Sequence, residues 1–479
     1  MSLNLRASSS ASGTSNLYDR TVNFSSYGGS PANTGADNTT ARQAFNAAHA
    51  AFTGSTQLII DPGTYAFSAR GPWGSSGLPG SKLTISAYGT ILQTQQGFGN
   101  AGTFEDNTHY ALMSTVSAGA STISLVTAGQ TSLFGVDKWV MLSCIDMQGF
   151  GFPQNAAVFE YKKIVSIGTG TLTFTEPLLY SYKSTYPNYS GGDASNAYQG
   201  GPAAVYVLSD PWDQEIEFKG AYFADVGDGF QGKCRVAKWT DCTFETFGPI
   251  PSACLLYRMS RCNAPGTGGL EIDKLIHRAE FLDSTPRAVD FQSASVNDLY
   301  VNNVTSSSRW RGGGGRNNRL VGLTTPDFEF GVMNYGAMGP TYMENCVSSG
   351  ATYFSASSFP FSDYTEEGGG VLSYAGGPGP ASASLSYWAV PGVNCILRDA
   401  SNGFARSFQV ADVTTTGGRT YVTTNLPFPV PSTINGKSAP WNIAPHPCAD
   451  ATLVNCSGST LFTNQSALPA NSPLFGWSL

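Results

Sequence analysis

Apolar residues recur roughly every 20 residues between positions 216 and 350, and this repeat is the strongest pattern in the chain. One column of the repeat contains Phe218, Trp239, Tyr257, Ile276, Leu299, Asn318 and Tyr342. A second column, five residues later each time, contains Phe223, Phe244, Cys262, Phe281, Val304, Leu323 and Val347. Two positions before the second column the residues are small or asparagine, namely Ala221, Cys242, Ser260, Ala279, Asn302, Val321 and Asn345.

The two columns predict strands that bend around a shared interior. Alternate residues of a strand point to the same side, so columns of opposite parity can share an interior only if the chain bends between them. Seven bent turns of about 20 residues, stacked on one another, describe a parallel β-helix. We therefore expect Phe223, Phe244, Phe281, Val304 and Val347 to point into one core. The alternative is an antiparallel sandwich with chance spacing, because individual gaps run from 18 to 24 residues.

Shorter patterns predict the elements on either side of the repeat. Thr40–Gln43 fits a capping box at the start of a helix, and Phe45, Ala48 and Phe52 mark its apolar face. Alternating residues within 111–183 predict an antiparallel β module inserted in the β-helix, and Gly417–Gly418 predicts a hairpin. Residues 447–456 fit one late coil. These patterns divide the chain into an arm (1–18), a capping helix with the first coils (19–110), the module (111–183), a central β-helix (184–360) and a C-terminal region of coils and a hairpin (361–479).

The N-terminal block resembles a known family. Asn33–Thr40, the helix after it and Ile59–Tyr65 are similar to the opening of pectin-lyase-like β-helices, a group that includes polysaccharide lyases, glycosidases and phage tailspikes. The resemblance implies an all-β, right-handed parallel β-helix whose open end is capped by the helix. It transfers no catalytic residue, because the chain lacks the aspartate pair, Gly-His-Gly and Arg-x-Lys of polygalacturonases, as well as the arrangement of a calcium-dependent pectate lyase. Its character is closest to that of phage tailspikes.

Composition narrows the functional classes. Only 12% of the residues are charged and the net charge is −7, which argues against nucleic-acid binding because that needs a basic surface. No apolar run is long enough to span a membrane. The start of the chain lacks the apolar core of a signal peptide, so either a signal was removed or the protein leaves its cell by another route, such as inside a virion. We expect an extracellular or virion-associated protein.

The nine cysteines and four histidines do not predict a metal site. The cysteines form no CxxC pair and fit small buried hydrophobic positions, and no two histidines stand four residues apart. We therefore expect no metal and no cofactor.

Acidic residues near the second column are the candidates for catalysis. Hydrolysis of a glycosidic bond needs one carboxyl group that donates a proton and one that is ionised. Asp225, Glu245 and Asp283 follow or adjoin the column, and Asp225 and Glu245 belong to adjacent coils. Close carboxylates would push their pKa values apart. The alternative is that all three are turn residues that bind local backbone groups.

Basic and aromatic residues recur four positions before the second column. This position contains Lys219, Thr240, Arg258, His277, Tyr300, Arg319 and Met343. If it faces outward, it forms a track for an acidic sugar chain, with Arg258, Tyr300 and Arg319 as binding residues and His277 as a catalytic base in a lyase. The alternative is an ordinary solvated surface whose long side chains cover apolar groups.

The segment from Arg309 to Arg319 contains four consecutive glycines. Such a run permits a tight loop with exposed amides. Trp310 could stack on a sugar ring, and Arg309 and Arg311 could each bind a carboxylate. The alternatives are a flexible interrupted coil and a contact between subunits.

Three functions fit these patterns. The first is an enzyme, a glycoside hydrolase or lyase, that degrades a bacterial surface or acidic polysaccharide. The second is a spike that binds glycan without cleaving it, and the third is a structural virion or surface protein. Because spikes of the family that the chain resembles form parallel trimers, we also expect a homotrimer.

Overall fold

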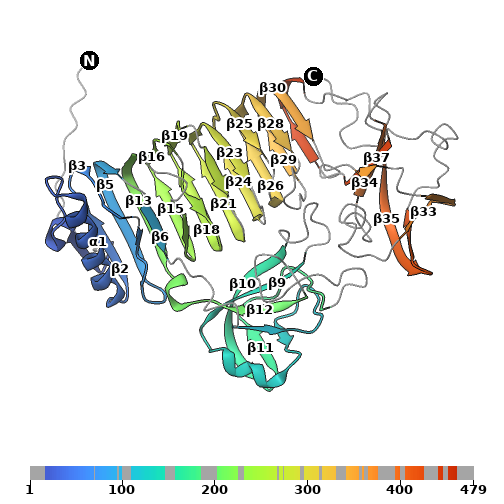
Figure 1. Ribbon diagram of the computed structural model, residues 1–479, viewed down its shortest axis with the longest axis horizontal. Coiled ribbons are helices and arrows are strands. Elements are labelled where there is room, and N and C mark those ends of the chain that lie inside the picture. Colours follow the sequence, from blue (N-terminus) through green and yellow to red (C-terminus); the bar gives the residue numbers. More distant parts are fainter. Residues whose placement is uncertain are drawn as a thin grey trace, which may run out of the picture.

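The computed structural model confirms the predicted fold class, a right-handed parallel β-helix with a capping helix and an inserted antiparallel module (Figure 1). Within the chain, it describes residues 17–69, 71–93, 96–99, 109–145, 157–184, 202–224, 231–246, 248–266, 269–272, 275–291, 296–311, 315–330, 341–354, 359–360, 365–375, 394–399, 405–424, 441–445 and 451–460.

The N-terminal end of the β-helix is covered by helix α1 (Gly35–Ala50), in blue in Figure 1. Its first turn begins six residues before the predicted capping box, because Thr34 is the N-cap and its side chain accepts a hydrogen bond from the N–H of Asp37. Thr40 lies inside the helix, where its hydroxyl donates to the Ala36 carbonyl. Phe45 is fully buried and packs 6.1 Å from the ring of Trp73, so the helix closes the aromatic end of the core.

Parallel strands of successive coils form the main sheet of the β-helix. In spatial order they are β1 (Arg20–Asn23), β2 (Ser55–Ile59), β5 (Lys82–Gln93), β13 (Glu215–Ala224), β15 (Val236–Thr240), β18 (Cys254–Ser260), β21 (Ile276–Leu282), β24 (Val296–Asn302), β26 (Gly315–Val321), β29 (Thr341–Glu344) and β38 (Ala451–Val454). Short strands that continue these coils past the bend are β3 (Gly63–Tyr65), β16 (Thr243–Phe244), β19 (Asn263–Ala264), β22 (Thr285–Pro286), β27 (Thr324–Thr325) and β39 (Ser457–Thr460).

Two further parallel sheets complete the coils. One contains β4 (Gly71–Trp73), β6 (Gln96–Gly99), β14 (Gln231–Lys233) and β17 (Ile250–Pro251). The other contains β20 (Leu270–Ile272), β23 (Ala288–Phe291), β25 (Arg309–Arg311), β28 (Asp327–Phe330) and β30 (Val347–Phe354). Because each coil pairs with its neighbours, like positions stack at about 4.8 Å and share one core.

The inward ladders differ from the predicted columns. One ladder contains Phe218, Trp239, Met259, Phe281, Val301, Leu320 and Met343, all buried. Phe223 and Phe244 stack past the bend, with ring centroids 5.0 Å apart. Phe281 is therefore in the core, as expected, but in the first ladder. Val347 is 40% exposed and Cys346 points inward instead, so the prediction for Val347 is wrong. Unequal coil lengths shift the spacing that the sequence repeat assumed.

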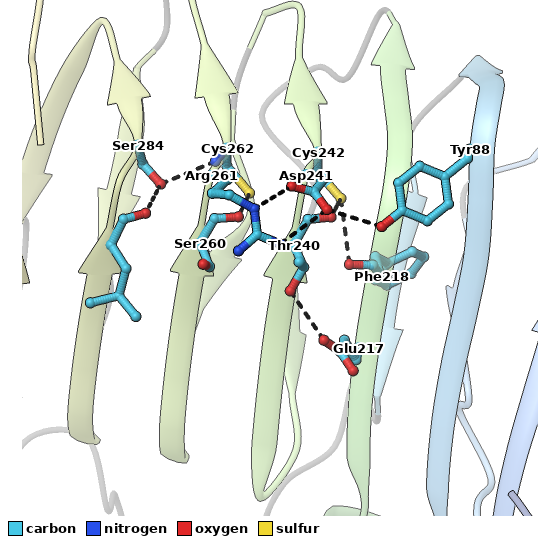
Figure 2. A network of polar contacts seen from close by, with 11 residues as sticks. Tyr88, Glu217, Phe218, Thr240, Asp241, Cys242, Ser260, Arg261, Cys262 and Ser284 are labelled. Atoms are coloured by element: carbon cyan, nitrogen blue, oxygen red, sulfur yellow. Dashed lines mark hydrogen bonds and ion pairs between the residues drawn. The ribbon is translucent and has the colours of Figure 1, made fainter. Parts of the chain in front are cut away.

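A left-handed residue turns each coil at the bend. These residues are Gly220, Asp241, Arg261, Asp283, Asn303, Gly322, Asn345 and Asn455. The next residue begins the second strand and points inward, in a ladder of Ala221, Cys242, Cys262, Ser284, Val304, Leu323, Cys346 and Cys456. Figure 2 shows this bend: the Cys262 thiol and the Ser284 hydroxyl each donate to the carbonyl two residues earlier. Glycine and asparagine tolerate the positive φ that the turn requires.

Side chains of the left-handed residues connect neighbouring coils on the outside of the bend. The Asp241 carboxylate accepts hydrogen bonds from the Tyr88 hydroxyl at 2.9 Å and from Arg261 Nε at 2.6 Å (Figure 2). The hydrogen bond from Arg261 lowers the pKa of Asp241. This network ties three consecutive coils together.

An antiparallel sheet interrupts the β-helix between β5 and β13. Its strands are β7 (Tyr110–Leu112), β8 (Thr122–Ser124), β9 (Trp139–Ile145), β10 (Ala157–Gly168), β11 (Thr171–Phe174) and β12 (Ala204–Val207). The Tyr161 hydroxyl donates to the Leu275 carbonyl at 2.7 Å, and Asn297 Nδ2 donates to the Phe159 carbonyl at 2.8 Å. The module is therefore fixed to the starts of β21 and β24, as its position below them in Figure 1 also shows.

A second antiparallel sheet follows β30. It contains β31 (Phe359–Pro360), β32 (Thr365–Gly368), β33 (Val371–Ala375), β34 (Asn394–Asp399), β35 (Ala405–Thr416), β36 (Arg419–Thr424) and β37 (Trp441–Pro445). The predicted hairpin at Gly417–Gly418 connects β35 and β36. The chain then returns to the solenoid, where β38 pairs with β29, and this pairing confirms the late coil.

Candidate functional site

The predicted acidic residues do not form a pair among the residues that the structure describes. Glu245 is exposed directly after β16, and its N–H donates to the Phe223 carbonyl at 2.9 Å. Asp283 is one of the left-handed turn residues, with φ of 47°, and accepts a hydrogen bond from Asn303 Nδ2 at 2.8 Å. The two residues occupy different positions of the coil, so Asp283 fits the turn interpretation. Asp225 lies outside the described residues.

Three of the predicted binding residues lie in one outward row of the main sheet. Arg258 pairs with Glu280, Glu280 with Tyr300, and Tyr300 with Arg319 in consecutive strands. We call this set the charged row; it contains Lys238, Arg258, Glu280, Tyr300, Arg319 and Tyr342. Because stacked positions repeat every 4.8 Å or so, the row presents basic and aromatic groups at a regular spacing.

A carboxylate fixes two arginines at the centre of the row. Arg258 Nε and Arg278 Nε each lie 2.5 Å from an oxygen of Glu280. The Glu280 side chain is 5% exposed, whereas those of Arg258 and Arg278 are 38% and 49% exposed. A buried carboxylate is stable only when it is paired, and here two cations compensate it. Glu280 therefore holds both guanidinium groups at the surface in fixed orientations.

The far end of the row combines a cation with an aromatic ring. The Arg319 guanidinium lies over the Tyr342 ring, 4.9 Å from its centroid. The Tyr342 hydroxyl donates to Glu344 at 3.1 Å, and this hydrogen bond raises the pKa of Tyr342. Tyr342 is thus held in place by groups on both sides of its ring.

His277 lies at the edge of the same sheet, where β21 meets the inserted module. Its Nδ1 is 3.1 Å from Asn297 Nδ2, which also binds the Phe159 carbonyl of the module. Burial lowers the pKa of His277, although the Asp298 and Glu160 carboxylates oppose the shift. The imidazole is therefore neutral near pH 7, the state in which it can accept a proton.

The neighbouring groups of the module are also paired. Glu160 and Lys162 form a buried ion pair at 3.1 Å, and Glu160 accepts further hydrogen bonds from the N–H of Leu179 and the hydroxyl of Tyr182. Lys162 donates to the Pro177 carbonyl. This network keeps the module wall beside His277 rigid.

The arginine and tryptophan segment does not contribute to this surface. Trp310 is fully buried and its ring packs against Phe281 at 5.5 Å, so it is a core residue and the predicted sugar stacking is wrong. Arg309 lies on β25 in another sheet, where its Nη2 is 3.3 Å from Asp290. Arg311 ends the same strand, and its side chain lies outside the described residues, as do Gly312–Gly314.

The sequence patterns missed Arg278, Asp298 and Tyr342. Arg278 pairs with Asp298 in the row next to the charged row, and Asn317 Nδ2 donates to Asp298 at 2.9 Å. The alternation of charged and buried residues from Arg278 to Phe281 was the available signal for the outward position of Arg278 and Glu280.

Solved structures similar to this chain include three phage tailspikes. The Gp54 tailspike of Acinetobacter baumannii bacteriophage AP22, in complex with an A. baumannii capsular saccharide, is 10% identical; the match covers 68% of this chain and 58% of that chain, with a TM-score of 0.39. The tailspike gp49 from Pseudomonas phage LKA1 is 11% identical over 69% of this chain and 60% of that chain, with a TM-score of 0.41. The Pseudomonas phage phi297 tailspike gp61 is 9% identical over 88% and 98%, with a TM-score of 0.34.

The match thus spans about three fifths of the length of the first two tailspikes. No protein-family model and no curated protein matches the chain. Among the residues that the structure describes, no helix has the length and apolar character needed to cross a membrane.

Proposed function

We propose that this protein is a virion-associated or extracellular spike that binds and degrades an acidic bacterial surface polysaccharide along the charged row. The observation that carries the proposal is the pair of half-exposed arginines, Arg258 and Arg278, held by Glu280. Guanidinium groups bind carboxylates in a planar, two-pronged geometry, and aromatic rings pack on the apolar faces of ligands. Tyr300 and Arg319 continue the same surface over the next two coils.

For the cleavage step we propose a lyase mechanism with His277 as the base. In such a reaction an arginine neutralises the sugar carboxylate, which acidifies the adjacent C–H, and a neutral base removes the proton. The lowered pKa of His277 and its place at the edge of the arginine-bearing sheet favour this residue. Hydrolysis by Glu245 with Asp225 is the second candidate, because the register pairs Phe223 with Phe244 and brings their coils together.

The test is incubation of the protein with a panel of capsular and cell-wall polysaccharides. A lyase produces unsaturated sugars that absorb in the ultraviolet, and a hydrolase produces reducing ends without that absorbance. His277→Gln should lower turnover at least ~100-fold with binding retained, whereas Glu245→Gln should leave it unchanged. The reverse result would assign the reaction to Glu245. Glycan binding without either product would mean a non-catalytic spike, and no binding would favour a structural protein.

We also propose that the protein forms a homotrimer through a second outward row, past the bend. This neutral row contains Ile91, Tyr222, Thr243, Asn263, Thr285, Thr305, Thr324, Val347 and Ser457. It carries no charged side chain, and Ile91, Tyr222 and Val347 are 36–40% exposed. A long uncharged strip costs little to desolvate, so it suits side-by-side packing of parallel copies.

A further inference from the structure

Three pairs of cysteines occupy the same register position in adjacent coils. They are Cys234 with Cys254, Cys242 with Cys262, and Cys346 with Cys456. All six are free thiols. The first two pairs are fully buried, and their members are 20 residues apart in the sequence. The third pair differs in both respects.

Cys346 and Cys456 connect the last coil to the one before it. The register pairs Glu344 with Val454 and Val347 with Ser457, so the two cysteines face each other across adjacent parallel strands. They are 110 residues apart, because the chain forms the C-terminal antiparallel sheet between them. Stacked residues of neighbouring strands have Cα atoms about 4.8 Å apart, which is within the range that a disulfide spans.

The backbone around the two cysteines is the same. Each follows an asparagine in the left-handed conformation, Asn345 with φ of 53° and Asn455 with φ of 52°. Each thiol also lies 3.5 Å from the carbonyl oxygen two residues earlier. Both side chains therefore adopt the same orientation within the ladder, and their sulfur atoms are neighbours.

Accessibility and thiol chemistry distinguish this pair. Of the cysteines that the structure describes, Cys456 alone is partly exposed. The hydrogen bond from the Cys346 thiol lowers the pKa of Cys456 to about 7. Burial instead raises the pKa of Cys234 and Cys242. Since the thiolate is the nucleophile in exchange reactions, Cys456 is the thiol that an oxidant can reach first.

We propose that Cys346 and Cys456 are a site of oxidative modification, at which a disulfide fastens the last coil to the solenoid. In the reaction, the Cys456 thiolate attacks one sulfur of a small-molecule disulfide and expels its thiolate. Cys346, after losing its proton to solvent, then attacks the Cys456 sulfur and expels the second thiolate. The two protein thiols lose two electrons, and the reagent is reduced to two thiols. The proposal does not depend on the polysaccharide function.

The disulfide would close a loop that contains the whole C-terminal sheet. Cross-links that close long loops restrict the unfolded chain most, so this bond should stabilise the protein more than a link between Cys242 and Cys262. Because the last coil pairs with the solenoid through β29 and β30, the bond would also oppose its detachment from that end.

The test is oxidation of the full-length protein with oxidised glutathione, followed by alkylation, digestion and mass spectrometry. We expect a peptide pair linked through Cys346 and Cys456 and a melting temperature several degrees above that of the reduced protein. A C346S/C456S variant should fold, because Ser284 occupies the same ladder position and makes the same hydrogen bond, but should show no shift on oxidation. A C242S/C262S variant is the matched control and should keep the full shift.

Three results would overturn the proposal. The first is unchanged alkylation of Cys456 after oxidation. The second is glutathione left on Cys456, which would mean that Cys346 cannot reach it. The third is an equal temperature shift in C346S/C456S, which would place the reactive thiols elsewhere.

Discussion

The charged row and the neutral row belong to the same coils, on either side of one bend, yet their chemistry is opposite. In the charged row, Arg258, Glu280 and Arg319 make specific polar contacts, and the cations are oriented by neighbouring groups. In the neutral row, threonines stack from coil to coil. The backbone pairing is the same in both. The difference shows that the solenoid fixes only the spacing of side chains, and that the residue types at each outward position decide what a surface can bind.

This contrast makes the two rows separable by mutation. A change in the core should impair both surfaces, whereas a change in one row should leave the function of the other row intact.

The largest effect is expected from Phe244→Ala. Phe244 is fully buried under the bend and stacks on Phe223, so the truncation should lower the free energy of unfolding by about 3–5 kcal/mol. Urea unfolding followed by tryptophan fluorescence measures the change. Glycan binding and association should both weaken at temperatures near the lowered melting point. A loss below about 1 kcal/mol would contradict the packed core.

The next effect is expected from R258A/R278A in the charged row. Removing two charge-assisted contacts should weaken binding of an acidic polysaccharide about 10- to 100-fold, because each such contact contributes roughly 1.5–3 kcal/mol and part of this is lost to solvent screening. Isothermal titration or glycan arrays would measure it. Arg419→Ala, which removes a half-exposed arginine from the C-terminal sheet, is the control. Equal losses in both variants would argue against the charged row.

A smaller and selective effect is expected from Thr285→Arg in the neutral row. A charge at the centre of the strip should lower the trimer population, because burying an unpaired guanidinium in an interface is unfavourable. Light scattering at micromolar concentration measures the mass. Thr122→Arg, at an exposed position of the inserted module, is the matched control. A monomeric wild-type protein under these conditions would refute the proposed association itself.

The smallest effect concerns pH at the edge of the charged row. The pKa of His277 is lower in the folded protein than in the unfolded chain, so the unfolded state binds the extra proton as pH falls below about 6.5. The contribution to stability is therefore complete above that pH and is lost progressively below it. Urea midpoints at pH 7.5 and 5 should differ less for His277→Gln than for the wild type. An identical pH dependence would mean that His277 keeps its ordinary pKa.

The sequence predicted the fold class because the repeat of apolar residues survives small changes in coil length. It did not predict the register, since a shift of one or two residues moves a side chain to another ladder or to the outside. Phe281 illustrates the first case and Val347 the second. Arg258, Tyr300 and Arg319 were placed together correctly because each belongs to a strand of the main sheet. Trp310 was misjudged because a tryptophan between two arginines fits a core strand as well as a loop.

The two interruptions of the solenoid also determine the order in which its contacts can form. Between β13 and β29, paired residues are about 20 positions apart, as in Glu215 with Val236. At the ends the separations are far larger: Lys82 pairs with Glu215, and Thr341 pairs with Ala451. Contacts between distant residues form slowly, because the chain must first close a long loop. The middle coils should therefore acquire protection from hydrogen exchange first, and pulse labelling during refolding should find β38 among the last strands to be protected.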